Sequence, residues 1–174
     1  MAERVLVHDP GMEVDRNGLE VLSRDACLRL LATATLGRVG VSSGALPSVV
    51  PVNFRFDGRQ ILIRTGMGTK LDAAASNAVV AFEVDEIDPV AHTGWSVMVT
   101  GVARELTDPG ELAAAQTPPL ARWAPGDGHR VMAISTELVS GRRIVAGLAA
   151  PAEADRQCWW PPRRCGGIQR EAPT

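Results

Sequence analysis

Residues 49–65 read Val-Val-Pro-Val-Asn-Phe-Arg-Phe-Asp-Gly-Arg-Gln-Ile-Leu-Ile-Arg-Thr, two β-type segments on either side of Asp57-Gly58. An Asp-Gly pair between two such segments is a strong signal for a two-residue hairpin turn. The pattern predicts antiparallel strands from Pro47 to Phe56 and from Gln60 to Thr65. Pro51 has no N–H to donate to a sheet, which predicts an edge or a bulge where backbone groups stay free to meet a ligand.

Similar segments lie on both sides of this hairpin. We expect strands at Gly37 to Ser42, Ala78 to Asp85, Trp95 to Leu106 and Arg130 to Leu138, with a turn at Ser43-Gly44. We expect helices from the N-cap Ser23 to a point before Gly37, over Thr69 to Ser76, and over Glu111 to Ala115. Short strands joined by tight turns, without a βαβ alternation, favour a mainly β fold: an antiparallel barrel with small helices.

Length and composition limit the organisation and the partners of this chain. The 174 residues suggest one folded domain over 19–147, after a loose leader (1–18) and before a C-terminal tail (148–174) rich in Pro, Arg, Gly and Ala. A net charge of −2 with scattered arginines predicts no nucleic-acid partner. No apolar run approaches the ~20 residues that a membrane-spanning helix needs, and no export signal is apparent, so a cytoplasmic protein is expected.

The loop after the second strand of the hairpin is a candidate anion site. Lys70, the only lysine of the chain, ends the stretch Arg64-Thr65-Gly66-Met67-Gly68-Thr69-Lys70, which precedes the expected helix. A helix N-terminus directs backbone N–H groups and a partial positive charge at one point. Arg64 and Lys70 add two charges, and Thr65 and Thr69 add hydroxyls, as a phosphate monoester requires. The alternative is an exposed loop with solvated charges.

Two further segments carry candidate residues. The strand that begins Trp95-Ser96 starts with an aromatic ring and a hydroxyl, and Arg142-Arg143 follow an expected turn at Ser140-Gly141. Cys27, Cys158 and Cys165 are odd in number and poorly spaced for zinc, so free thiols and no metal site are expected.

Taken in order, these segments resemble the pyridoxamine 5′-phosphate oxidase-like flavoproteins, over roughly Leu19 to Gly147. The resemblance is carried by Leu-Gly-Arg-Val-Gly-Val (36–41), Val-Pro-Val-Asn-Phe (50–54), Asp57-Gly58, Arg-Thr-Gly…Thr-Lys-Leu (64–71), Gly-Trp-Ser-Val-Met-Val-Thr-Gly-Val-Ala (94–103) and Gly-Arg-Arg (141–143).

The resemblance implies a split β-barrel and a homodimer with FMN in a groove between the subunits. It implies that Arg64, Thr65, Thr69 and Lys70 hold the FMN phosphate. It also implies that backbone groups of Val50, Pro51, Val52 and Asn53 meet the isoalloxazine ring, and that Ser96, beside Trp95, touches the flavin.

The chain departs from the vitamin oxidase at its end. Arg142-Arg143-Ile144-Val145 stands where that enzyme has an Arg-x-His element, so activity on the vitamin phosphate is not expected. We expect an FMN-dependent oxidoreductase for a small organic substrate. The alternatives are a deazaflavin-dependent reductase of the same fold, a flavin-binding or sensing protein without turnover, and a scaffold that has lost its ligand. No catalytic side chain is assigned, because flavin chemistry needs no acid–base pair of its own.

The tail contains Trp159-Trp160, two large apolar side chains in a segment that has no core of its own. We expect the tail to be dispensable for folding. The two tryptophans are expected to dock on the domain or on a partner chain, with a free end as the alternative.

Overall fold

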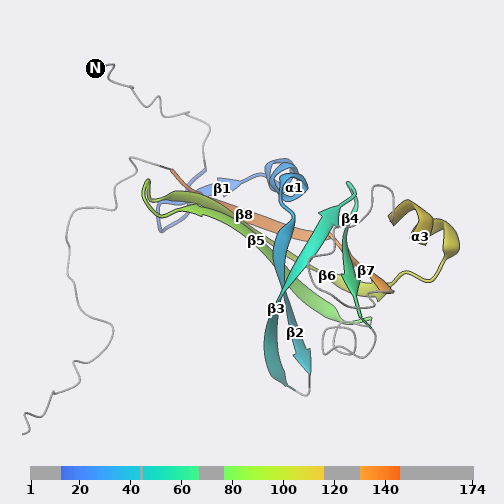
Figure 1. Cartoon of the computed structure of the whole chain (residues 1–174). Helices are drawn as coiled ribbons and strands as arrows, with labels where there is room; N and C mark the ends of the chain where they lie inside the picture. Colours follow the sequence, from blue (N-terminus) through green and yellow to red (C-terminus); the bar gives the residue numbers. More distant parts are fainter. Residues whose placement is uncertain (1–12, 44, 67–76, 116–129, 146–174) are drawn as a thin grey trace, which may run out of the picture.

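The computed structural model describes residues 13–43, 45–66, 77–115 and 130–145 (Figure 1). This part of the chain is mainly β, with two helices. In chain order its elements are β1 (Glu20–Leu22), α1 (Arg24–Thr33), β2 (Leu36–Ser43), β3 (Leu46–Phe56), β4 (Gln60–Thr65), β5 (Val79–Asp88), β6 (Thr93–Glu105), α3 (Pro109–Ala115), β7 (Arg130–Ser135) and β8 (Leu138–Ile144). The expected helix over Thr69 to Ser76 lies outside the described residues.

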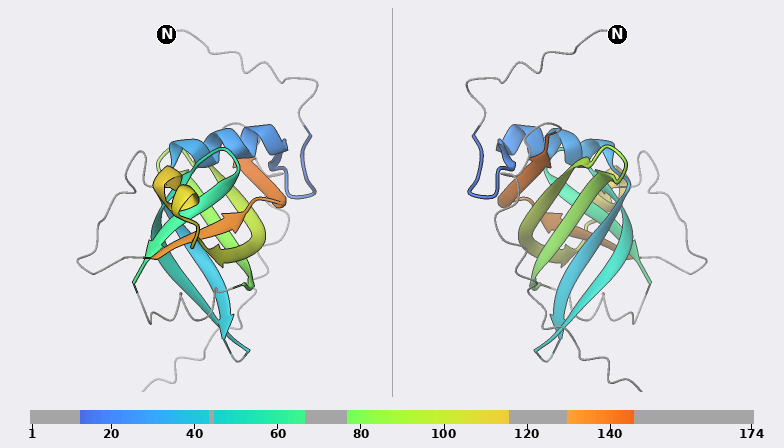
Figure 2. Two further views of the ribbon diagram at one scale, coloured as in Figure 1. Left: turned by 90° about the vertical axis from the view of Figure 1, so that its right-hand side faces the viewer. Right: turned by 90° about the vertical axis from the view of Figure 1, so that its left-hand side faces the viewer.

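Six antiparallel strands close into a barrel in the order β6-β5-β2-β3-β4-β7, with β7 returning to β6 (Figure 2). The long strand β6 makes closure possible because it changes partners along its length. From Gly94 to Thr100 it pairs with β8, and from Ala103 to Glu105 it pairs with β7. The expectation of an antiparallel barrel is confirmed.

The hairpin at Asp57-Gly58 is also confirmed, shifted by one residue. Asp57 N–H donates to the Gln60 carbonyl at 3.2 Å, and the Asp57 carboxylate accepts from the N–H groups of Arg59 and Gln60 at 2.9 Å each. Gly58 has φ +97, so the turn centres on Gly58-Arg59.

One expected strand was wrong. The segment expected as a single strand from Arg130 to Leu138 is split at Thr136-Glu137, and the expected Gly-Arg-Arg turn lies inside β8. The break is held by Arg24, which donates to the Thr136 carbonyl at 2.6 Å and to the Glu137 carbonyl at 3.2 Å. Gly141 is a glycine because α1 packs on it: a Cβ there would lie 2.6 Å from Cys27 Sγ.

The core fills the barrel with alternate residues of its strands. Its fully buried members include Val39, Ile61, Ile63, Phe82, Val84, Val97, Val99 and Ile134. Helix α1 lies across one end of the barrel (Figure 2) and buries Cys27 and Leu31 there. The predicted N-cap is confirmed, because Ser23 Oγ accepts from the Ala26 N–H at 3.2 Å.

A second, smaller apolar cluster lies on the outside of the barrel. Leu112 and Ala115 of α3 pack on Leu62 of β4 and on Val131 and Ala133 of β7. The helix therefore covers the outer side of β4 and β7, as Figure 1 shows.

Residues 13–18 precede β1 and form a turn held by Asp15. The Asp15 carboxylate accepts from the N–H groups of Asn17 and Leu19, and its second oxygen pairs with Arg142 Nε at 3.0 Å. β1 then pairs with β8, which adds two strands to the barrel beyond β6. No helix in the described residues is long and apolar enough to cross a membrane.

Candidate functional site

The outward side of β8, β6, β5, β2 and β3 forms a continuous surface, here called the outer sheet face. The strand register aligns its side chains in rows across the strands. One such row runs Ser140, Met98, Glu83, Arg38, Pro51. Side chains on one face of a sheet recur every second residue, so Ser96 of β6 and Asn53 of β3 lie on this face as well.

The edge predicted at Pro51 is present. β3 pairs with β2 from Leu46 to Asn53, but in the described part of the chain its pairing with β4 begins only at Phe54. No described residue therefore pairs with the other side of the β3 backbone over Val50 to Asn53. Val52 is buried in the core, whereas Pro51 is exposed on the outer sheet face.

Arg64 lies next to this edge. Because Ile63 pairs with Phe54, Arg64 stands beside Asn53 where β3 and β4 separate. The Nε atom of Arg64 is buried, and none of the described residues accepts a hydrogen bond from it. A buried donor without an acceptor is costly, so this guanidinium is suited to an anion.

Thr65 points the other way from Arg64, as neighbours in a strand do. It is buried, and its hydroxyl donates to the Gly66 carbonyl at 3.4 Å. Arg64 and Thr65 thus lie on opposite sides of β4. Thr69 and Lys70 lie outside the described residues, so the four-residue phosphate clamp stays a prediction.

Trp95 and Ser96 form a second group of candidate residues, distant from the first group, which is Arg64 and the edge of β3. Trp95 packs against the barrel core, and Ser96 lies on the outer sheet face. Met98, two residues from Ser96, is separated from Pro51 by three strand-to-strand steps, roughly 14 Å at ~4.8 Å per step. A single chain therefore does not bring Ser96 to the edge of β3.

A charged group occupies the surface between the two groups. Arg38 NH1 lies 2.8 Å from Glu83 Oε2 and 2.5 Å from Asp85 Oδ1. Hydrogen bonds to Asp85, and then to Glu83, raise the pKa of Arg38 above its already high usual value. The three side chains are partly exposed, so their ion pairs add little to the free energy of unfolding. Their main effect is a fixed pattern of charge on the outer sheet face.

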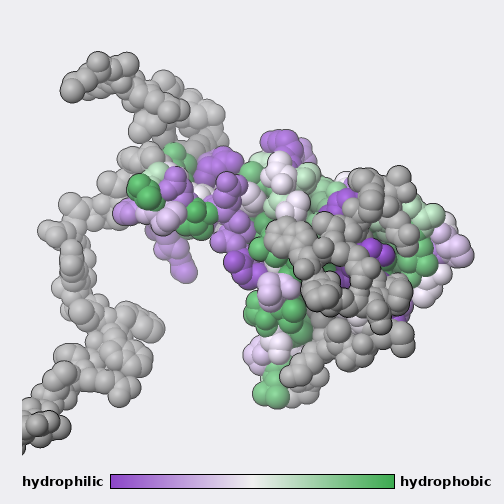
Figure 3. Space-filling model, in the orientation of Figure 1, coloured by the Kyte–Doolittle hydropathy of each residue, from purple (hydrophilic) through white to green (hydrophobic). Residues whose placement is uncertain are grey.

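Exposed apolar side chains surround this charged group on the outer sheet face: Leu36, Val49, Val79, Met98, Val102 and Leu138. In Figure 3 hydrophobic residues gather over the β2–β3 hairpin at the bottom of the view. Exposed apolar side chains that gather on one face of a folded domain are typical of an interaction surface.

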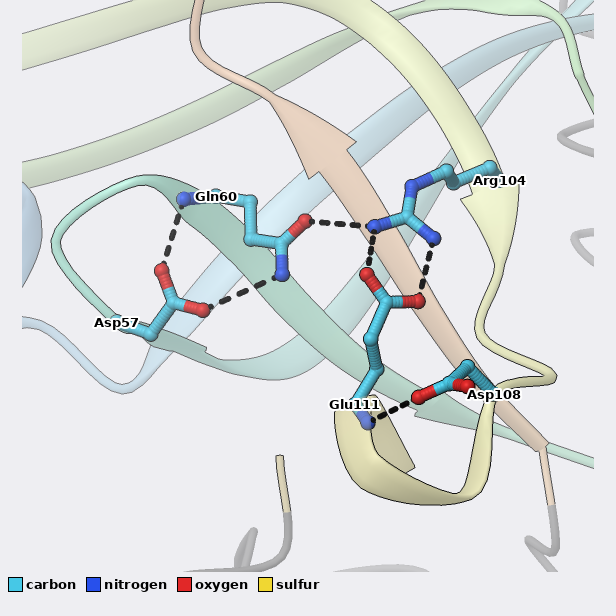
Figure 4. Close-up of polar contacts among 5 residues, drawn as sticks. All are labelled: Asp57, Gln60, Arg104, Asp108 and Glu111. Carbon is cyan, nitrogen blue, oxygen red and sulfur yellow. Dashed lines mark hydrogen bonds and ion pairs between the residues drawn. The ribbon is translucent and has the colours of Figure 1, made fainter. Parts of the chain in front are cut away.

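Sequence reasoning missed a polar cluster beneath α3 (Figure 4). Arg104 makes two hydrogen bonds with the Glu111 carboxylate, at 2.9 and 2.8 Å, and a weaker one with Gln60 Oε1 at 3.4 Å. The bond to Arg104 lowers the pKa of Glu111. Arg55 donates to the Ala115 carbonyl at 2.7 Å, at the end of the helix. These bonds attach α3 to the barrel, and within the cluster Arg104 and Glu111 form an ion pair.

Among the described residues no three histidine, cysteine, aspartate or glutamate side chains gather in a way that could hold a metal ion.

Comparisons with known proteins identify the fold and the family. The family model described as pyridoxamine 5′-phosphate oxidase matches residues 23–143. The uncharacterized protein Rv0080 from Mycobacterium tuberculosis is 40% identical over 135 residues, which cover 75% of this chain and 88% of that protein.

Two solved structures of FAD-binding proteins resemble this one. The FAD binding protein from Mycobacterium smegmatis is 37% identical, with a TM-score of 0.61, and the match covers 71% of this chain and 96% of that one. A FAD-binding protein from Mesorhizobium loti is 25% identical, with a TM-score of 0.63, and covers 73% of this chain and 99% of its own.

Proposed function

This chain belongs to the pyridoxamine 5′-phosphate oxidase family, and we propose that it is a flavoprotein: an oxidoreductase that binds FMN and acts on a small organic substrate. The proposal rests on the buried Nε of Arg64, which has no acceptor among the described residues, beside the edge of β3 that no described strand pairs over Val50 to Asn53. A flavin nucleotide offers each of these a partner, a phosphate for the guanidinium and ring N and O atoms for the backbone groups of Val50 to Asn53.

FAD and deazaflavin cofactors also carry a phosphate after the sugar-like chain, so the same guanidinium suits them. The FAD-binding proteins among the similar structures make FAD the first alternative to FMN. Measurement of the bound cofactor decides between them.

We also propose that the site is completed by a second copy of the chain. Three strand-to-strand steps separate Ser96 from the β3 edge of the same chain, and exposed apolar side chains surround the charged group of Arg38 on the surface between them. A homodimer that buries the outer sheet face brings Ser96 of one protomer toward the β3 edge of its partner. It also removes the exposed apolar side chains from water.

When bound, a flavin supplies the hydride chemistry of an oxidoreductase. The residues of this chain would position it: Arg64 holds the phosphate, and the β3 edge fixes the plane of the ring system. The outer sheet face of the partner excludes water. His92, the one histidine within the described ranges, is exposed in the β5–β6 turn, so it is no candidate for proton transfer at this site.

The test is the cofactor carried by the purified protein. An absorbance spectrum is expected to show flavin bands, and mass spectrometry of the heat-released molecule is expected to identify FMN. Release of FAD or of a deazaflavin would select an alternative cofactor. A colourless protein that takes up none of the three from solution would contradict the proposal.

A further inference from the structure

An open hollow lies at the free end of β5, β6 and β8, away from the Arg64 site. It encloses about 310 Å³ and is lined by Glu86, Ile87, Asp88, Thr93, Gly94, Trp95, Arg143 and Ile144. We call it the end hollow. Its lining residues lie at the end of the sheet where β5 turns into β6, and Figure 1 shows that these strands extend past the barrel there.

The strand register places an aromatic ring and charged groups on one side of this sheet. Glu86 pairs with Trp95, and Trp95 pairs with Arg143, so the three side chains share a face. Arg143 is already bound to the Glu20 carboxylate, at 3.2 and 3.3 Å. Its charge is therefore not available to the acids across the hollow.

The two acids of the end hollow have no cationic partner in the described part of the chain. Asp88 Oδ1 accepts hydrogen bonds from the N–H groups of Val90 and Ala91 at 2.9 Å each, which lower its pKa and keep it charged. Glu86 is exposed. Two carboxylates beside a tryptophan suit an arginine-rich segment, because a guanidinium pairs with carboxylates and stacks on aromatic rings.

The chain itself supplies such a segment. β8 ends at Ile144, on the rim of the end hollow, so the residues that follow start there. Residues 156–164 read Arg-Gln-Cys-Trp-Trp-Pro-Pro-Arg-Arg, with three arginines, two tryptophans and no acid. Val145 and Arg156 are eleven residue-to-residue steps apart, a stretch that spans up to about 36 Å and is more than long enough to return to the hollow.

We propose that residues 156–164 dock into the end hollow of the same chain, with arginine side chains on Glu86 and Asp88 and a tryptophan against Trp95. Docking gives the two acids their missing counter-charges. It also shelters the apolar surface of Trp159-Trp160, which is unfavourable in water. Glu86, Asp88 and Trp95 are thus the receptor for the tail, independent of any cofactor.

Disulfide trapping tests the proposal with the full chain. Cys158 lies in the docking segment and Thr93 lines the end hollow, so Thr93→Cys in a Cys165→Ser background places two thiols close together. Cys27 is fully buried. The matched control is Ala114→Cys, an exposed position of α3, and α3 lies at the opposite end of the molecule from the β5–β6 turn (Figure 1). Mass spectrometry after mild oxidation of dilute protein quantifies each bond.

A bond between Cys158 and position 93 is expected to form within one chain, at least tenfold faster than a bond to position 114. Glu86→Gln with Asp88→Asn is expected to slow it severalfold without altering the far-ultraviolet circular dichroism. Equal rates at the two positions would overturn the proposal, as would a bond between two chains or a rate unaffected by removal of the acids. None of these readouts depends on flavin, so this proposal and the proposed function can fail separately.

Discussion

Gly141 of β8 lies directly against Cys27 of α1, so that a Cβ at position 141 would stand 2.6 Å from Cys27 Sγ. The same Cβ would also stand 3.0 Å from Leu22 Cδ1 and 3.0 Å from the Ser96 carbonyl oxygen. The absence of a side chain at Gly141 therefore allows α1 to pack closely against β8.

Gly141→Ala is accordingly expected to lower the free energy of unfolding by about 1–3 kcal/mol, the usual cost of an overpacked core. Thermal unfolding measures the loss. Cys27→Ala in the same chain removes the sulfur and is expected to recover part of it. If the double variant is as unstable as the sum of the single ones, the two residues do not share this contact.

The turn between β2 and β3 contains strain at Ala45. This residue has φ +65, a conformation that costs a residue with a Cβ about 1–2 kcal/mol and that glycine adopts freely. Ala45→Gly is expected to leave the melting temperature unchanged or to raise it by a few degrees. Ala81→Gly, in the middle of β5, is the control and is expected to lower it. Equal losses in both variants would contradict the turn geometry.

Low pH is expected to destabilise the turn before β1, because protonation of Asp15 weakens the hydrogen bonds that hold this turn. The hydrogen bond from Leu19 N–H, followed by those from Asn17 and Arg142, lowers the pKa of Asp15 below its usual 3.8. A carboxyl with a depressed folded-state pKa contributes stability above its unfolded pKa, and that stability is lost as pH falls through the folded value. The free energy of unfolding, measured in urea, should thus fall more steeply below about pH 4 for the parent than for Asp15→Asn. Parallel curves would show that Asp15 is not the sensor.

The proposed homodimer predicts different effects for two exposed valines. Val79, on the outer sheet face, is 69% exposed, and Val90, in the β5–β6 turn, is 91% exposed. Val79→Glu places a charge in the proposed interface and is expected to give monomers that hold flavin more weakly. Val90→Glu is expected to leave both properties unchanged. Light scattering at low micromolar concentration measures the mass, and a parent protein that is monomeric with tightly bound flavin would contradict the two-chain site.

The strand segments and the β3–β4 hairpin followed from local signals, but the order and the register of the strands in the barrel did not. Alternating apolar residues and the turn residues near Asp57-Gly58 predicted the β3–β4 hairpin, because both signals are local in the chain. The Gly-Arg-Arg segment was mistaken for a turn because the need for Gly141 arises from α1, more than a hundred residues away. Asp15 and Glu20, which pair with the two arginines of β8, were likewise too distant in sequence to be assigned.

The sequence predicted the β3 edge of the candidate site, but it did not predict which of the other candidate residues lie together. Pro51 indicated the unpaired stretch of β3, since a missing N–H is visible in the sequence. Adjacent residues of a strand point to opposite sides, so Arg64 and Thr65, or Trp95 and Ser96, cannot act as neighbours on one face. The separation of Ser96 from Pro51 depends on which strands lie between them, which only the sheet order reveals.

The central claim is that Arg64 holds the phosphate of a bound flavin, and its most direct test is the preference for FMN over riboflavin. We expect the parent to bind FMN more tightly than riboflavin. We expect Arg64→Ala to lose about ten- to hundredfold in FMN affinity, as removal of one charge-assisted hydrogen bond implies, and little in riboflavin affinity. Arg29→Ala, an exposed position on α1, is the control and should keep the parent's preference. Equal loss of both ligands in Arg64→Ala, or an unchanged preference, would contradict the account.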